Sequence, residues 1–295
     1  MIQRGSSAVQ RLYEVLDLEP EIKEAPSGRV PARLTGRFEL RHLNYTYPFT
    51  HKRVLTDISF KAKTGEMIAI LGPIGAGKST LLKLFVRLLD PEPGSLFLDG
   101  FDIRDYSLAQ VRSQVSLVLQ DPFLFAESMK SNLSYDDPGR SLDQVWIAAE
   151  AADLTDTIMT LPHKMDTIIG ERGVTLSGGQ KQRSTLARGL IREAPILILD
   201  DCFSSIDTET EEVILRRLKK LRLGLTTLLV SHRVSTVRHA DRIVVLNQGR
   251  VAETGTHEEL LARRGLYAHI EAVQNRRTEL LRSIENEAPR GEFQT

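Results

Sequence analysis

MIAILGPIGAGKSTLLKLFVRLL, residues 67–89, is the stretch that decides the fold. Its first five residues, Met67–Leu71, are all apolar, which is typical of a buried strand, and the apolar residues of Leu81–Leu89 recur at helical spacing. Between them, GPIGAGKS has the spacing of a phosphate-binding loop, a motif that requires a strand before it and a helix after it. Both are present, so the stretch predicts a strand, a tight loop and a helix that bind a phosphate chain.

The residue types of this loop suit phosphate binding. Glycines at positions 72, 75 and 77 permit backbone conformations that larger residues avoid, so successive N–H groups can turn toward phosphate oxygens. The helix offers free N–H groups and the positive end of its dipole, Lys78 can reach the β- and γ-phosphates, and Ser79 offers a hydroxyl to magnesium. A glycine-rich turn without a ligand is the alternative. The residues predicted to bind the nucleotide are Gly72, Pro73, Ile74, Gly75, Ala76, Gly77, Lys78, Ser79 and Thr80.

The composition of the 295 residues limits the classes of function. The 39 Lys and Arg residues balance the 39 Asp and Glu residues, so no net charge attracts nucleic acid, and no nucleic-acid partner is expected. The single cysteine, Cys202, cannot form an internal disulfide, which suits a reducing cytosol. Neither a bilayer-spanning apolar stretch nor a signal pattern is present, so we expect a soluble, cytosolic chain.

The pattern along the chain predicts three parts. Apolar residues on or near one face of residues 1–24 predict an amphipathic helix, and the turn-rich residues 25–31 predict a linker after it. We therefore assign residues 1–33 to a linker helix and linker, 34–275 to the folded domain, and 276–295 to a charged C-terminal tail.

Within the folded domain, two kinds of strand pattern predict an α/β fold. Alternating residues in Phe38–Tyr47 and Val54–Ala62, with a short pair at 95–98 and 102–103, predict an antiparallel β-lobe. Continuous apolar runs separated by helical patterns predict a parallel core sheet with right-handed crossovers. Helical patterns without strands predict an α-helical lobe at about residues 122–185. The predicted core strands are residues 67–71, 115–119, 196–199, 226–230 and 243–246.

Leu176–Gln180, LSGGQ, is a second glycine-bearing motif in front of a helix. Ser177 and the backbone amides of Gly178 and Gly179 can bind an anion at the start of that helix, and a turn that only caps the helix is the alternative. The motif resembles the signature of ATP-binding cassette (ABC) proteins. It also stands in the order expected for that family, after the phosphate loop and before a strand that ends in Asp200.

The resemblance covers about Phe38–Glu271 and implies a P-loop NTPase with a RecA-like core sheet, an antiparallel β-lobe and an α-helical lobe. It implies ATP and Mg²⁺ as ligands. It also implies a head-to-tail pair of cassettes, because in this family the signature caps the γ-phosphate of ATP held by a second cassette. The signature residues assigned to the partner's ATP are Leu176, Ser177, Gly178, Gly179 and Gln180.

The resemblance also assigns residues around the nucleotide. Tyr47 resembles the aromatic residue that stacks on adenine, with an ordinary strand aromatic as the alternative. His232 resembles the switch histidine that contacts the γ-phosphate. Asp200 resembles the carboxylate that holds magnesium, together with Ser79 and with Gln120, which touches the magnesium shell and moves with the helical lobe.

One residue departs from the family pattern. The residue after the magnesium carboxylate is normally a glutamate that orients or deprotonates the attacking water, and here it is Asp201. Because aspartate is one methylene shorter, we expect slow hydrolysis and unimpaired nucleotide binding, with Asp201 and His232 as the catalytic residues. Family members with aspartate here are commonly one half of a heterodimeric exporter. A different partner chain is therefore favoured over a second copy, with Ser204 and Asp207 in the loop that crosses to the partner.

Two further stretches resemble exporters. The pattern of residues 3–14 is similar to the helix that leaves the last membrane helix, and Gly170–Gly173 is similar to the loop that meets transmembrane coupling helices, with Ile168 in place of a usual glutamate. The resemblance implies a cassette excised from a longer transporter, with a transmembrane domain as partner, at the cytoplasmic face of the cell (inner) membrane.

Other classes remain as alternatives. A non-transport ABC ATPase acting on DNA ends or ribosomes shares only the ATP core, and the long heptad arms or second cassette of those proteins do not occur here. The basic residues of 216–222 fit a nucleic-acid patch less well than a helix C-terminus whose charges complement its dipole. An importer subunit would lack the linker helix. A nucleotide-binding regulator that does not turn over ATP is a further alternative, which Asp201 supports. A measurement of phosphate release distinguishes such a regulator from an ATPase.

Overall fold

The computed structural model describes residues 9–14, 16–17, 20, 22–23, 31–170 and 173–287. Residues 9–14 and 16 are helical, in agreement with the predicted N-terminal helix as far as it is described, and Val9, Leu12 and Leu16 are exposed. Residues 17, 20, 22 and 23, which the prediction also placed in this helix, are not helical, so the helix ends before the predicted residue 24. The other residues of that predicted helix, the predicted linker up to residue 30, residues 171–172 of the predicted coupling loop, and the tail after residue 287 lie outside the described residues.

A four-stranded antiparallel sheet forms the predicted β-lobe. Its strands are β1 (Phe38–Thr46), β2 (Arg53–Ala62), β4 (Leu96–Leu98) and β5 (Phe101–Asp102), in the order β2-β1-β4-β5. Burial alternates along β1 and β2 as their apolar residues do. Phe38 packs edge-on against Phe85 of α2 (Lys78–Phe85), with ring centroids 4.9 Å apart, so the lobe is attached to the helix that follows the phosphate loop.

A six-stranded sheet forms the core. Its strands are β3 (Met67–Leu71), β6 (Val115–Val118), β7 (Ile196–Asp200), β8 (Thr226–Ser231), β9 (Arg242–Asn247) and β10 (Arg250–Gly255), in the order β10-β9-β3-β8-β7-β6. The pairings from β9 to β6 are parallel, as predicted, whereas β10 was not predicted and pairs antiparallel with β9. The carboxyl ends of β3, β7 and β8 therefore meet at one edge, where open α/β sheets bind ligands.

The core sheet separates two apolar cores. Ile68 and Ile70 of β3 pack with α2 and the β-lobe, whereas Ala69 and Leu71 face the opposite core. That opposite core is built with α7 (Gly178–Leu190), α8 (Thr208–Leu221) and α9 (Val234–Val237). Because both faces are covered, β3 is apolar throughout and β8 has an apolar centre, Leu228–Val230, which explains why the sequence revealed them.

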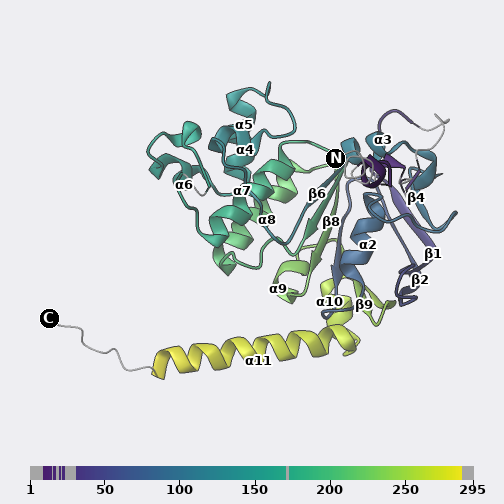
Figure 1. Cartoon of the computed structure of the whole chain (residues 1–295). Helices are drawn as coiled ribbons and strands as arrows, with labels where there is room; N and C mark the ends of the chain where they lie inside the picture. The colour runs from purple at the N-terminus through teal and green to yellow at the C-terminus, as the bar shows by residue number, and fades with distance from the viewer. Residues whose placement is uncertain are drawn as a thin grey trace.

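The remaining helices complete the lobes. The helical lobe contains α4 (Met129–Leu133), α5 (Leu142–Ala151) and α6 (Thr155–Thr160), and α3 (Leu108–Gln114) precedes β6. Figure 1 shows the helical lobe and the β-lobe on opposite sides of the core sheet. After α10 (His257–Ala262), α11 (Leu266–Glu287) runs beneath the body as one unbroken helix across the boundary that we placed at residue 275.

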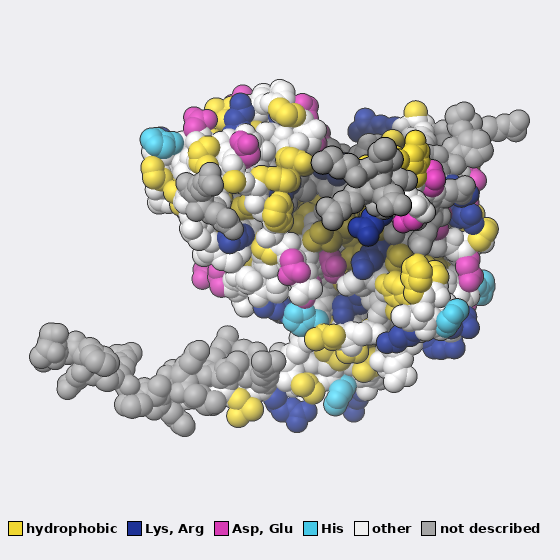
Figure 2. Space-filling view, in the orientation of Figure 1, with side chains coloured by type: hydrophobic (Ala, Val, Ile, Leu, Met, Phe, Trp, Pro, Cys, Tyr) yellow, Lys and Arg dark blue, Asp and Glu magenta, His cyan; other side chains and the backbone are white. Residues whose placement is uncertain are grey.

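The surface carries both signs of charge. On the face in Figure 2, basic and acidic side chains are interspersed over the lobes rather than gathered by sign. Of the helices that the structure describes, none is both long enough and apolar enough to cross a membrane.

Candidate active site

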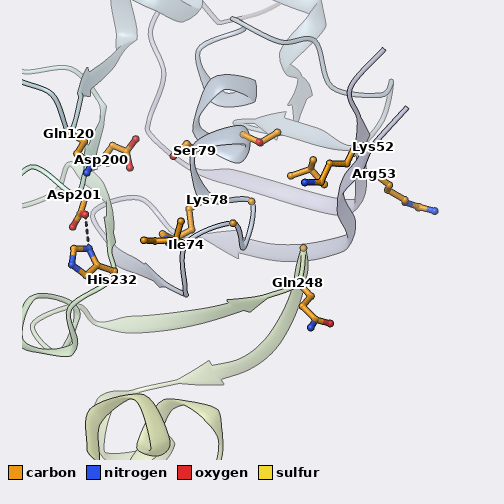
Figure 3. A pocket seen from close by; sticks show the side chains of 15 residues that line it. Lys52, Arg53, Ile74, Lys78, Ser79, Gln120, Asp200, Asp201, His232 and Gln248 are labelled. Carbon is orange, nitrogen blue, oxygen red and sulfur yellow. Dashed lines mark hydrogen bonds and ion pairs between the residues drawn. The ribbon is translucent and has the colours of Figure 1, made fainter. Parts of the chain in front are cut away.

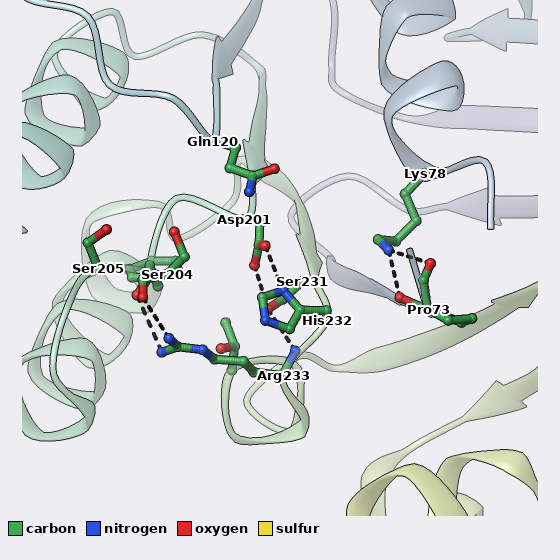
Figure 4. Close-up of polar contacts among 12 residues, drawn as sticks. Pro73, Lys78, Gln120, Asp201, Ser204, Ser205, Ser231, His232 and Arg233 are labelled. Atoms are coloured by element: carbon green, nitrogen blue, oxygen red, sulfur yellow. Dashed lines mark hydrogen bonds and ion pairs between the residues drawn. The ribbon is translucent and has the colours of Figure 1, made fainter. Parts of the chain in front are cut away.

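The phosphate loop is held by close backbone packing. Gly77 precedes α2 with a φ of 98°, and a Cβ at Gly72 would lie 2.4 Å from the carbonyl oxygen of Leu246 in β9. Glycine is therefore required at both positions. Lys78 Nζ donates to the carbonyl oxygens of Gly72 (2.6 Å) and Pro73 (3.0 Å), so the lysine folds back over the loop (Figure 4), and burial lowers its pKa.

A cavity of about 530 Å³ opens beside this loop. It brings together most of the nucleotide and magnesium residues that the sequence predicted, from the loop on one side and from the ends of β7 and β8 on the other (Figure 3). The predicted residues that line it are Ile74, Gly75, Gly77, Lys78, Ser79, Thr80, Gln120, Asp200, Asp201 and His232.

Tyr47 is not among the residues that line the cavity. Its ring is half-buried, packs edge-on against Tyr45 with centroids 5.2 Å apart, and its hydroxyl lies 3.2 Å from Thr80 Oγ1. Tyr47 is therefore anchored to the helix that follows the phosphate loop, and its adenine-stacking role stays a prediction.

Asp201 and His232 form a hydrogen-bonded pair across the ends of β7 and β8. His232 Nδ1 lies 2.6 Å from Asp201 Oδ2, and Ser231 Oγ donates to Asp201 Oδ1 over 3.1 Å (Figure 4). Asp201 has a φ of 45° and is largely buried. Its carboxylate is thus fixed toward the histidine, at the end of the cavity that faces Lys78.

The signature is exposed and lies outside this cavity. Ser177 caps α7, because its Oγ accepts from the backbone N–H of Gln180 while the side chain of Gln180 accepts from the N–H of Ser177. Ser177 and Gly178 are exposed, whereas Leu176 is buried in the helical lobe. The chain therefore presents the signature to the outside and does not bring it to its own phosphate loop.

Known proteins resemble this chain in both sequence and fold. Residues 55–204 match the family model described as ABC transporter. The chain belongs to the ABC transporter family. The predicted family and fold class are confirmed.

The relatives of this cassette include several transporters. It is 42% identical over 273 residues to an ATP-dependent lipid A-core flippase of Syntrophus aciditrophicus, across 92% of this chain and 45% of the flippase. It is 39% identical to the uncharacterized ABC transporter ATP-binding protein YwjA of Bacillus subtilis, across 93% of this chain and 48% of that protein. The solved structure of a bacterial Atm1-family ABC exporter with ATP bound matches with a TM-score of 0.87 and 36% identity, over 92% of this chain and 48% of the exporter. The chain thus spans about half the length of the relatives it matches.

The residues at the cavity fit magnesium carried in by ATP. Mg²⁺ is usually held by one or two carboxylates, waters and substrate phosphates rather than by a cage of protein ligands. Asp200 supplies a carboxylate, Ser79 a hydroxyl and Gln120 an amide oxygen at one cavity. Within the described ranges, His, Cys, Asp and Glu form no cluster of three or more that could hold a metal ion alone.

Asp200 titrates at an unusually high pH for an aspartate. Burial, and secondly the charge of Asp201, raises the pKa of Asp200 to about 6. Because the folded state binds this proton more tightly than the unfolded state, the contribution of Asp200 to stability falls as the pH rises from about 4 through 6. The ionised carboxylate therefore destabilises the cassette above pH 6 when magnesium is absent.

We therefore expect Asp200→Asn to stabilise the nucleotide-free, magnesium-free cassette at pH 8. After discounting for solvent screening of a partly exposed group, the gain is about 1 kcal/mol, or ~2–4 °C in Tm. Melting curves of both chains between pH 4.5 and 8 in EDTA test this. A Tm difference that does not grow across pH 6 contradicts it.

Several residues of the site were not predicted. Lys52, Arg53 and Val54 line the cavity at the start of β2, and Gln248 and Gly249 line it from the β9–β10 turn. The glycine of this Gln-Gly pair, which stands between two strands, is a local signal that predicts a turn. The Thr56 N–H donates to the Gly249 carbonyl over 2.7 Å and holds this turn against β2. The turn reaches the cavity through this tertiary contact, which the local sequence does not indicate.

Gln182 is a further residue that the sequence did not single out. It is 2% exposed, its Nε2 donates to Ser204 Oγ (2.8 Å), and its Oε1 accepts from the Ser205 N–H (2.8 Å). Arg233 donates to the Ser204 carbonyl over 2.6 Å from the other side (Figure 4). The predicted partner-crossing loop is thus fixed between the signature helix and the segment that carries His232. Asp207 ends this loop, is exposed, and caps α8 by accepting from the Thr210 N–H.

Proposed function

We propose that this cassette binds Mg-ATP at its phosphate loop and closes head-to-tail on a second cassette, whose signature caps the same nucleotide. The observation that carries the proposal is the separation of the two motifs. The phosphate loop, Asp200 and His232 share one cavity, whereas the exposed Ser177 lies outside it. Although Ser177 Oγ accepts from the Gln180 N–H, the exposed Ser177 and Gly178 offer a hydroxyl and a backbone N–H to an anion at this helix start, so a partner's γ-phosphate is the ligand that suits it.

In the proposed reaction, each group of the cavity has one task. Lys78 leaves the carbonyls of Gly72 and Pro73 and donates to the β- and γ-phosphates. Asp200 and Ser79 would hold magnesium, which would neutralise phosphate charge. Asp201 orients the attacking water. His232, held by Asp201 through Nδ1, points its other nitrogen at the γ-phosphate. Phosphate release then allows the cassettes to separate.

The proposed site turns over slowly, because the Asp201 carboxylate is short and is already engaged by Ser231 and His232. We expect Asp201→Glu to raise phosphate release from Mg-ATP about tenfold, since the added methylene extends the carboxylate toward the water. Asp201→Asn is the matched control and should lower the rate. Steady-state phosphate release by the purified chain measures both, and an unchanged rate for Asp201→Glu contradicts the role of the shortened side chain.

The proposed partner is a different cassette with a defective signature, so that the intact Leu176–Gln180 of this chain completes the faster of two unlike sites. A cassette that binds ATP and does not turn it over is the second candidate, and Asp201 is the observation that favours it. The wild-type chain releases no phosphate in that case, while ATP still binds.

The proposed coupling partner is a transmembrane domain, by analogy with the exporter relatives. A cavity of about 720 Å³ between the segments 122–126, 168–170 and 174–176 supports this, because it opens on a surface where Phe123 is 64% and Ile168 49% exposed. Exposed apolar side chains around a groove are typical of a protein-binding surface. We propose that short coupling helices of the transmembrane domain occupy this groove at the cytoplasmic face of the membrane, so that closure of the cassettes pulls on them.

A further inference from the structure

The segment that carries His232 is held by the C-terminal helix. One side chain of α11, Gln274, contacts two backbone groups around the histidine: its Nε2 donates to the His232 carbonyl over 2.6 Å, and its Oε1 accepts from the Val234 N–H over 2.9 Å. A single amide thus spans His232–Val234. Because the amide group has both a donor and an acceptor, glutamine is suited to this double contact.

The contact also caps α9. The N-cap residue of α9, Arg233, makes no capping hydrogen bond with its side chain, so the first N–H groups of α9 need another acceptor. Gln274 supplies one at Val234 from a helix 40 residues further along the chain. The start of α9 and the backbone of His232 therefore depend on where α11 lies.

The beginning of α11 is rigidly attached to the body. The carboxylate of Glu253 accepts from the backbone N–H groups of Leu266 (2.6 Å) and Tyr267 (3.1 Å), and Tyr267 is fully buried with its hydroxyl 2.7 Å from His257 Nδ1. Tyr267, Ile270 and Gln274 follow the i, i+3, i+7 spacing that places residues on one helix face. Because the first turn of α11 is held in this way, Gln274 faces the segment that carries His232.

We propose that Gln274 is a positioning residue for ATP hydrolysis, through which α11 holds the backbone of His232 so that the imidazole keeps its contact with Asp201 and its reach to the γ-phosphate. The inference rests on the proposed role of His232. Beyond Gln274, α11 continues to Glu287 away from the body, with Leu280 63% exposed (Figure 1).

Two variants separate the two contacts. Gln274→Ala removes both, and Gln274→Glu keeps the acceptor for Val234 and places a carboxylate oxygen against the His232 carbonyl. We expect both to lower kcat for Mg-ATP about tenfold with KM within about twofold, because displaced reacting groups affect the chemical step rather than binding. Val273→Ala, on the adjacent exposed position, is the control and should leave kcat unchanged.

Amide hydrogen exchange at Val234 gives a readout independent of turnover. We expect exchange to accelerate in Gln274→Ala and to stay slow in Gln274→Glu, because only alanine removes the acceptor. His232→Ala in the same assays tests the underlying function. If His232→Ala abolishes turnover while the Gln274 variants keep wild-type kcat, or if Val234 exchange is unchanged in Gln274→Ala, the inference is overturned. If His232→Ala keeps full turnover, the proposed role of His232 fails and the inference fails with it.

Discussion

Lys78→Ala is expected to weaken ATP binding about 100-fold. Lys78 is the one cation of the phosphate loop itself, and its Nζ already lies within 3.0 Å of the loop carbonyls of Gly72 and Pro73, next to the place proposed for the phosphates. Charge-assisted hydrogen bonds to a phosphate contribute about 3 kcal/mol at such a site, which corresponds to this factor. Equilibrium titration with a fluorescent ATP analogue in the presence of magnesium measures it.

The matched control is Lys83→Ala. Lys83 lies on the same helix α2, and its side chain is exposed. We expect its removal to change the affinity less than twofold, because exposed charges are screened by solvent. Equal losses in the two variants are the result that contradicts a specific phosphate contact for Lys78.

Gly178→Asp is expected to abolish ATP-driven pairing of cassettes and to reduce turnover by at least about 100-fold. The structure allows this test without damage to the fold, because a Cβ at Gly178 meets its nearest neighbour, Ser205 Cβ, at 3.7 Å, whereas a Cβ at Gly179 would lie 2.9 Å from the Ser205 carbonyl oxygen. An aspartate at a helix start also suits the helix dipole. The new carboxylate would, however, face the phosphate of the partner's nucleotide and repel it.

ATP affinity is the internal control for this variant. Because the signature lies outside the cavity of its own chain, Gly178→Asp should bind ATP as the wild type does. Gly178→Ala separates bulk from charge and should retain more pairing than the aspartate variant. Weakened ATP binding in Gly178→Asp monomers, measured with Lys78→Ala as reference, contradicts the separation of the two motifs.

Most of the fold could be predicted because its strands are covered on both faces. β3 and β8 are buried throughout; β3 is continuously apolar and β8 has the apolar centre Leu228–Val230, and glycine-bearing motifs mark the helix starts at Gly77 and Ser177. β10 escaped prediction because it is a half-buried edge strand, and its sequence, RVAETG, alternates only weakly. The boundary that we placed at residue 275 falls inside α11, because nothing in the sequence of this helix marks where it leaves the body.

The residues of the candidate site could be predicted from the sequence only where they belong to a single local motif. The loop residues and Asp200 follow from local spacing, and the structure places them at one cavity. Lys52, Gln248 and Gln274 depend on contacts between segments that are distant in sequence, and no local pattern encodes such contacts. The exposure of Ser177 is likewise a property of the packed helical lobe. For these residues the tertiary structure is the only source of the inference.

A mixing experiment tests the central claim most directly. In the claim, each nucleotide is held by the phosphate loop of one chain and the signature of another, so a pair of one Lys78→Ala chain and one Gly178→Asp chain retains one intact site. Sedimentation in Mg-ATP should show each variant as a monomer alone and a dimer with one bound ATP when the two are mixed. A mixture that stays monomeric, under conditions in which the wild-type chain pairs, contradicts the account.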